Sequence, residues 1–152
     1  MRTKYWINTR DKPGLLLAMM HQFENSANIS FEGSLNNLLL SSIPGASMKE
    51  QGMLKRAVLA PESDFIVIPI TTETIRYIWK EITDKDHLAH EGIAHVQIEK
   101  NGKIVFGAYD NFDKECVVAY DDVPIYLLDR LKEKGVIRSY DEQSEVDVDM
   151  ST

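Results

Sequence analysis

The feature that most constrains the fold is the segment IAHVQIEKNGKIVFGAYD, residues 93–110. Apolar and polar residues alternate on both sides of Asn101-Gly102, as they do in half-buried β-strands. Asn-Gly supplies the two residues with positive φ that a type I′ turn requires, and the twist of this turn matches that of paired strands. The chain therefore contains an antiparallel hairpin, and a sheet must be built around it.

The rest of the chain alternates between strand and helix patterns. Further strands are predicted at residues 3–9, 28–34, 53–60, 65–70 and 115–121. Helices are predicted at residues 14–25, about 72–82 and 123–135. Thr71 or Thr72 can cap the second helix, and Gly135 suits the end of the third. The turn PESD predicts that the strands at 53–60 and 65–70 form a second hairpin.

This order of elements predicts an α+β fold, an antiparallel sheet with helices on one face. The two β-α-β segments have the spacing of a ferredoxin-like split unit. Residues 1–140 are expected to form one domain, in which residues 101–140 extend a first part, residues 1–100. Residues 141–152 hold five acidic residues and no basic one, and they are predicted to be a disordered, solvated tail.

Charge and composition narrow the classes of function. A net charge of −7 argues against a nucleic-acid partner, because phosphate binding needs a basic surface. No apolar run approaches the roughly 18 residues that span a membrane, and the N-terminus lacks the apolar core of a signal peptide. The single Cys116 cannot form an internal disulfide, which fits a reducing compartment. We therefore expect a cytoplasmic protein with no membrane or nucleic-acid partner.

The segment TRDKPGLLLAMMHQF, residues 9–23, predicts a strand that turns directly into a helix. The first N–H groups of a helix have no intrahelical partner, and the helix dipole attracts anions there. The N–H groups of Gly14, Leu15 and Leu16 can thus hold a carboxylate. Asp11 can accept hydrogen bonds from a ligand amine or cap the helix itself. The simplest alternative is that the turn only ends a strand and starts a helix.

The same residues resemble the start of an ACT domain. In that family a turn of the Asp-x-Pro-Gly type joins the first strand to the first helix, and an Asn-Ile pair often begins the second strand. The matching residues here are Asp11, Pro13, Gly14, Leu15, Asn28 and Ile29. The likeness covers residues 3–30, and residues 65–100 fit by strand-helix-strand pattern alone. Residues 35–52 are long for an ACT domain, and residues 101–140 exceed it.

ACT domains are ferredoxin-like βαββαβ modules that usually bind amino acids or similar small effectors, commonly at a subunit or domain interface. The resemblance thus implies a small regulatory protein, a homodimer, that senses an amino acid or another small carboxylate. It implies ligand-binding residues at Asp11, Pro13, Gly14, Leu15, Leu16 and Asn28.

The segment DHLAHEGIAH offers a metal-dependent enzyme as another hypothesis. Its candidate ligands are His87, His90, Glu91 and His95. Their spacing matches no strong metal motif, and a solvated loop is the simpler interpretation. The chain also lacks a Walker loop, a GxGxxG motif and a Ser-His-Asp pattern. The sequence therefore predicts no cofactor and does not favour an enzyme.

A third hypothesis is an interaction module that binds a protein partner through its sheet or its acidic end. Tyr109 and Phe112 either cover a sheet edge or form part of such a surface. Cys116, in the apolar strand ECVVAY, is interpreted as a small buried hydrophobe. Its acidic neighbours Asp113 and Glu115 would raise the pKa of the thiol if they lie close to it.

Overall fold

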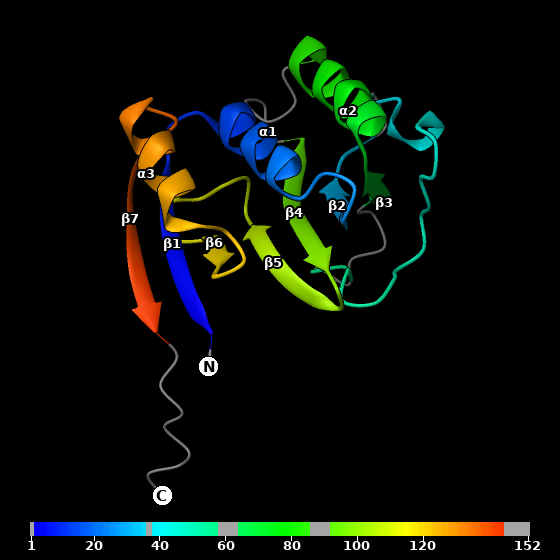
Figure 1. Cartoon of the computed structure of the whole chain (residues 1–152). Coiled ribbons are helices and arrows are strands. Elements are labelled where there is room, and N and C mark those ends of the chain that lie inside the picture. The colour runs from blue at the N-terminus through cyan, green and yellow to red at the C-terminus, as the bar shows by residue number, and fades with distance from the viewer. Residues whose placement is uncertain (1, 36–37, 58–63, 86–91, 145–152) are drawn as a thin grey trace, which may run out of the picture.

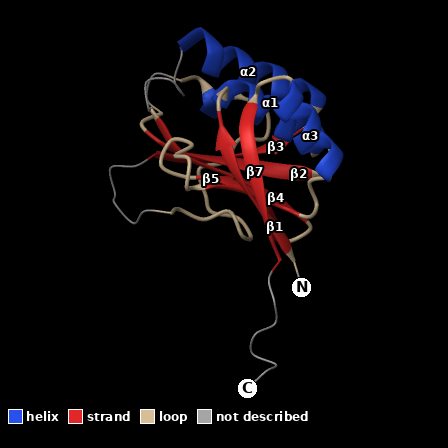
Figure 2. Cartoon of the chain, turned by 90° about the vertical axis from the view of Figure 1, so that its left-hand side faces the viewer, coloured by secondary structure: helices blue, strands red, loops and turns tan. Residues whose placement is uncertain are grey.

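The computed structural model describes residues 2–35, 38–57, 64–85 and 92–144. They form a seven-stranded antiparallel sheet with three α-helices on one face (Figures 1 and 2). The strands are β1 (Thr3–Thr9), β2 (Ala27–Gly33), β3 (Asp64–Ile70), β4 (Ile93–Lys100), β5 (Lys103–Ala108), β6 (Val117–Tyr120) and β7 (Ile137–Ser144). The helices are α1 (Lys12–Gln22), α2 (Thr72–Lys85) and α3 (Ile125–Glu133), with a short 3₁₀ helix, η1 (Leu40–Ser42).

The strand order β3-β2-β4-β5-β6-β1-β7 contains two split β-α-β units. Strands β3 and β4 are both antiparallel to β2 and hence parallel to each other, with α2 connecting them. Strands β6 and β7 flank β1 in the same way, with α3 between them. The first unit, β1-α1-β2, is wider than its spacing predicts, because β6, β5 and β4 lie between its strands. One sheet thus joins strands from residues 1–100 and 101–140.

The main core lies between the three helices and the sheet. Each helix contributes apolar side chains that are fully buried, such as Leu15 on α1, Ile78 on α2 and Leu128 on α3. Phe31 on β2 and Phe106 on β5 meet them from the sheet. Burial of these apolar side chains is the main force that holds the helices on this face.

Several local signals act as the sequence predicts. The Oγ1 atom of Thr71 caps α2 by accepting a hydrogen bond from the backbone N–H of Thr74 at 3.0 Å. Asn101 and Gly102 have φ values of 53° and 77° in the turn between β4 and β5. Gly135 has a φ of 76° just beyond α3. These features depend on contacts within a few residues, so they can be predicted from local sequence.

Three differences from the predicted elements affect the fold most. Helix α1 begins two residues early, at Lys12, because the preceding residue caps it. The predicted hairpin of residues 53–60 with 65–70 is wrong for the part described: residues 53–57 form no strand, and β3 pairs with β2. Residues 58–63 lie outside the described part. Residues 141–144, assigned to the acidic tail, are the second half of β7, while residues 145–152 lie outside the description.

Residues 43–57, which we call the covering segment, pass around the β3 edge of the sheet. Ile43 and Ala46 pack on the main core, and the part around Leu54 packs on the sheet face opposite the helices. Leu54 is fully buried there against Phe65, Val67 and Ile104, which form a second small core. The backbone N–H of Met53 donates a hydrogen bond to Glu99 Oε2 at 2.9 Å. The covering segment therefore shields the part of this sheet face that lies near β3.

Candidate functional site

Asp11 fixes the turn between β1 and α1. Its Oδ1 atom accepts a hydrogen bond from the N–H of Gly14 at 3.0 Å, so its side chain is the N-cap of α1. The N–H groups of Arg10 and Asp11 both donate to the carbonyl oxygen of Val136, at 3.0 and 2.9 Å. The turn is therefore held between the start of its own helix and the start of β7.

The helix-start N–H groups of the predicted site are largely occupied by this cap. The N–H of Gly14 bonds the Asp11 side chain, and the N–H of Leu15 donates to the Asp11 carbonyl oxygen at 2.9 Å. The side chains of Leu15 and Leu16 are fully buried in the main core. A Cβ at Gly14 would collide with Asp11 Oδ2. Of the two roles open to Asp11, the structure shows the cap.

Pro13 and Asn28 occupy different ends of α1. Pro13 lies in the first turn of the helix, as its fixed φ favours. Asn28 follows the helix and lies on β2, opposite Pro69 and Glu99 of the neighbouring strands. A helix of 11 residues, about 16 Å long, lies between them. Within one chain, Asn28 therefore does not join the Asp11 turn.

Lys12 connects this turn to the loop between β5 and β6. Its ammonium donates a hydrogen bond to Asn111 Oδ1. Asp110, Asn111 and Phe112 have consecutive φ values of 52°, 56° and 59°. A left-handed backbone costs a non-glycine residue roughly 1–2 kcal/mol, so the surroundings must hold it.

Asn111 provides the fixed point of that left-handed turn. Its backbone N–H donates to the carbonyl oxygen of Ala94 at 2.7 Å, and its Nδ2 donates to that of Ile93 at 2.9 Å. Phe112 is 4% exposed and belongs to the main core. Tyr109 and Phe112 therefore do not form the exposed apolar patch that one version of the interaction hypothesis requires.

The residues at and near the β1–α1 turn include three cationic ones, of which Arg10 belongs to the turn itself. The Arg10 guanidinium lies 3.7 Å from the position a Cβ would take on Gly135. Lys134 and Arg138 stand two residues before and after Val136, which anchors the turn. Arg10, Lys134 and Arg138 are all exposed, and none forms an ion pair within the described ranges. The positive end of the α1 dipole lies next to Arg10, which precedes the Asp11 cap.

Of the four candidate metal ligands, only His95 lies in the described part of the chain. His87, His90 and Glu91 lie outside the described residues. His95 is buried on β4, where its Nδ1 accepts a hydrogen bond from the N–H of Asp110 at 3.2 Å. In the part of the chain that the structure describes, no three His, Cys, Asp or Glu side chains gather as a metal site would require.

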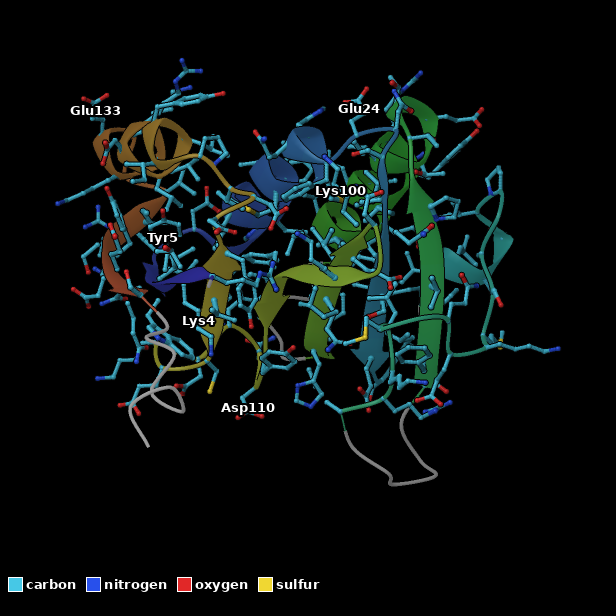
Figure 3. The ribbon with its side chains drawn as sticks, turned by 60° about the horizontal axis from the view of Figure 1, so that its bottom comes forward. Lys4, Tyr5, Glu24, Lys100, Asp110 and Glu133 are labelled. Atoms are coloured by element: carbon cyan, nitrogen blue, oxygen red, sulfur yellow. The ribbon has the colours of Figure 1, made fainter. Side chains whose placement is uncertain are left out.

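Cys116 is only half-buried and precedes β6, so the prediction of a buried strand residue is wrong, but its acidic environment is as predicted. Burial raises the pKa of the thiol, and the charges of Asp110, Asp113 and Glu115 raise it further. The Sγ atom is 3.6 Å from Asp110 Oδ2, and Asp110 lies at the periphery of the molecule (Figure 3). A raised thiol pKa disfavours the nucleophilic thiolate, so this cysteine is not an activated one.

A row of polar side chains on the covered sheet face escaped the sequence analysis. Ser30 and Glu32 on β2 stand opposite Gln97 and His95 on β4. The signal was available, because polar residues alternate with apolar ones in NISFE and HVQIE. The N–H of Ala57 donates to Glu32 Oε1 at 2.7 Å. Glu32 therefore helps to anchor the covering segment.

Tyr109 closes the end of this row. Its hydroxyl accepts a hydrogen bond from Gln97 Nε2 at 2.9 Å, and its ring lies over Gly107, where a Cβ would meet it at 2.7 Å. Burial raises the pKa of the Tyr109 hydroxyl. This row is therefore a packed surface, and its polar side chains form hydrogen bonds within the protein.

A hollow of about 330 Å³ lies on α2, away from the predicted site. Its lining among the described residues consists of Glu73, Arg76, Tyr77 and Lys80. These side chains share one solvent-facing side of a single helix, at the i, i+3, i+4 and i+7 positions. None of the residues predicted to bind a ligand lines it.

Comparisons with known proteins do not identify a family or a function for this chain. No protein-family model matches the chain, and no curated protein or solved structure matches it. The ACT-domain resemblance therefore stays a prediction. None of the helices in the described ranges has both the length and the apolar character needed to cross a bilayer.

Proposed function

We propose that this is a small regulatory protein that binds an amino acid or a similar small carboxylate at the β1–α1 turn. The observation that carries the proposal is the exposed Arg10 guanidinium beside the start of α1. It has no ion-pair partner among the described residues, and the helix dipole adds positive potential at the same place. An arginine fork and a carboxylate match geometrically, so Arg10 would hold the anion.

The neighbouring residues would position the turn. Lys12 donates a hydrogen bond to Asn111, and this contact keeps the start of α1 in place. The Lys12 ammonium adds a second positive charge. Asp11 uses Oδ1 for the cap, which leaves Oδ2 for the amine of an amino acid. Gly14 is required because a side chain there would displace Asp11. The ligand would thus be held by side chains at the rim of the turn rather than by the helix N–H groups.

The proposed likeness to an ACT domain concerns the β1–α1 turn and helix α1. The ferredoxin-like part lies in the split units β3-α2-β4 and β6-α3-β7, each built around one intervening strand. In an ACT-like assembly the ligand would be shared between two chains. Asn28 is remote from the turn within one chain and is therefore not part of the proposed site.

A thermal-shift screen of amino acids and simple carboxylates tests this proposal. A ligand at 100 times its dissociation constant stabilises the protein by about 2.7 kcal/mol, which should raise Tm by a few degrees. Arg10→Gln should abolish the shift, while Lys132→Gln, an exposed change on α3, should preserve it. A flat screen, or a shift that survives Arg10→Gln, would contradict the proposal.

Asp11→Ala is a poor test of binding. Loss of an aspartate N-cap costs about 1 kcal/mol of stability without any ligand. This variant would therefore lower Tm by itself, and its ligand response would be hard to separate from the loss of the cap. Arg10→Gln avoids this problem because the Arg10 side chain makes no hydrogen bond to α1 among the described contacts.

A protein partner is the second candidate function. It is favoured by the open edge of the sheet at β7, whose exposed side chains are mostly charged or polar. Open strand edges offer backbone groups to another chain, a common mode of peptide recognition. The two candidates differ in the surface they use, so they can be tested separately.

A further inference from the structure

Strand β7 forms one edge of the seven-stranded sheet. It pairs with β1 on one side, and no described strand or segment pairs with it on the other (Figure 1). The strand is eight residues long, and most of its side chains are exposed. In an antiparallel sheet, alternate residues of such an edge direct N–H and C=O groups outward. These groups can pair with one further strand.

We propose that this further strand is β7 of a second copy of the chain, paired antiparallel in the register centred on Tyr140. A two-fold axis normal to the sheet makes such an interface self-complementary. It places Arg138 opposite Glu142 of the second copy, and symmetry repeats this pair on the other side of the axis. Directly opposed charges of opposite sign stabilise strand pairs, whereas like charges destabilise them.

The positions of the charges select this register. Centring the pair on Asp141 or on Glu142 places two identical carboxylates opposite each other at the axis. Centring it on Ser139 places Arg138 opposite Tyr140 and leaves the cation without a carboxylate. Only the Tyr140 register, among these four, sets the basic residue of the strand against an acidic one.

Helix α3 supplies apolar surface beside the same edge. Tyr140 donates its hydroxyl hydrogen to Asp129 Oδ1 at 2.6 Å, so this side of α3 faces β7. Ile125 and Tyr126 lie four and three residues before Asp129, hence on the same side of the helix. They are 43% and 67% exposed, which is high for such side chains. A second copy at the edge would cover part of this surface.

This inference goes beyond the proposed ligand site and does not depend on it. The interface uses β7 and α3, whereas the ligand would contact the exposed side chain of Arg10. A dimer of this kind would join two seven-stranded sheets into one continuous sheet. It would also remove the exposed edge that otherwise invites aggregation.

Sedimentation velocity over a range of protein concentrations tests the proposal. The wild-type chain should reach twice its mass of 17.3 kDa at micromolar concentration. Arg138→Glu and Glu142→Arg should each weaken the dimer at least tenfold, because each creates two like-charge pairs. Lys114→Glu and Glu115→Arg make the same charge changes in the exposed β5–β6 loop and should leave the dimer intact.

Mixing the two single variants provides the decisive measurement. In the proposed register, position 138 of the Arg138→Glu chain faces position 142 of the Glu142→Arg chain, so a carboxylate meets a guanidinium. The second pair, between the unchanged Glu142 and the unchanged Arg138, is also opposite in charge. The 1:1 mixture should therefore dimerise although neither variant does so alone, and the double variant R138E/E142R should dimerise by itself. Recovery in the mixture also shows that both variants are folded.

Two outcomes would overturn the proposal. The first is a wild-type chain that stays at 17.3 kDa at every concentration examined. The second is a dimer that both single variants form as tightly as the wild type, because it would use another surface. An open β7 that binds only an unrelated peptide would appear as the first of these results.

Discussion

The two edges of the sheet end in different ways. At the β3 edge, the covering segment forms a bridge: Ser47 N–H donates to Val67 O at 2.9 Å, and Val67 N–H donates to Ser47 O at 2.7 Å. Gly45 packs against the ring of Pro69 on the same strand. At the β7 edge, no described segment forms such a bridge. The described part of the chain thus closes the β3 edge and forms no such bridge at the β7 edge.

The difference between the two edges shows the role of the long connection between β2 and β3, which is to cover the β3 edge. Both ends of the sheet have the same topology, a split unit with a helix above it. Within the described ranges, only the β3 end has a segment on the opposite face, with Leu54 as its apolar anchor and Glu99 accepting a hydrogen bond from Met53. The β7 end is held from the helix side, by α3 and the Tyr140–Asp129 hydrogen bond. One edge is therefore a closed structural feature, and the other is a candidate interface.

The largest expected effect comes from Leu54→Ala, which would detach the covering segment. Removing a buried leucine costs about 2–5 kcal/mol, and we expect about 2–3 because the segment can partly collapse onto Phe65. Urea unfolding would measure the change in the free energy of unfolding, and hydrogen exchange at Val67 would report the opening of the edge. Met53→Ala is the control, since Met53 is half exposed. A loss below about 0.5 kcal/mol would show that the segment does not stabilise the edge.

Ser47→Pro should open the β3 edge more selectively. Proline removes the N–H that bonds Val67 O, and an unmet buried carbonyl costs about 1–2 kcal/mol. Ser47→Ala keeps this N–H and is the matched control. Urea unfolding and aggregation on heating would follow the change, and the proline variant should aggregate sooner because it exposes a second edge. Equal behaviour of the two variants would mean that the bridge has no protective role.

Tyr140→Phe should have the smallest effect, at the β7 edge. It removes a hydrogen bond to an exposed carboxylate, which is worth about 0.5–1 kcal/mol. Hydrogen bonding to Asp129 and burial raise the pKa of Tyr140 from 10.0 to about 12. The contribution should therefore be complete below about pH 10 and disappear as the pH rises towards 12. Comparing the free energies of unfolding of the wild type and of Tyr140→Phe at pH 8 and at higher pH would measure this contribution.

A matched substitution separates this hydrogen bond from general loss of a hydroxyl. Tyr126→Phe, on the exposed side of α3, should leave the free energy of unfolding unchanged at both pH values. A Tyr140→Phe effect that persists unchanged above pH 12 would contradict the assigned cause, because the ionised hydroxyl can no longer donate.

Much of the β1–α1 turn could be predicted, but its chemistry could not. The strand at 3–9 and the helix after Pro13 follow from local pattern, and Asp11 as a cap was one of two stated alternatives. The contact of Lys12 with Asn111 joins residues 99 positions apart, so no local pattern contains it. The N–H groups of Gly14 and Leu15 were predicted to bind a ligand. That prediction did not take into account that both groups donate hydrogen bonds to Asp11.

The sequence by itself determined the elements whose causes are local. The Asn101-Gly102 turn, the Thr71 cap and Gly135 after α3 each depend on the conformational preference of one or two residues. Tertiary structure alone decided that β7 exists and pairs with β1, because its polar residues on both faces lack the alternation that marks a strand. It also decided which edge is covered, since the bridge between Ser47 and Val67 forms only when the sheet has brought them together.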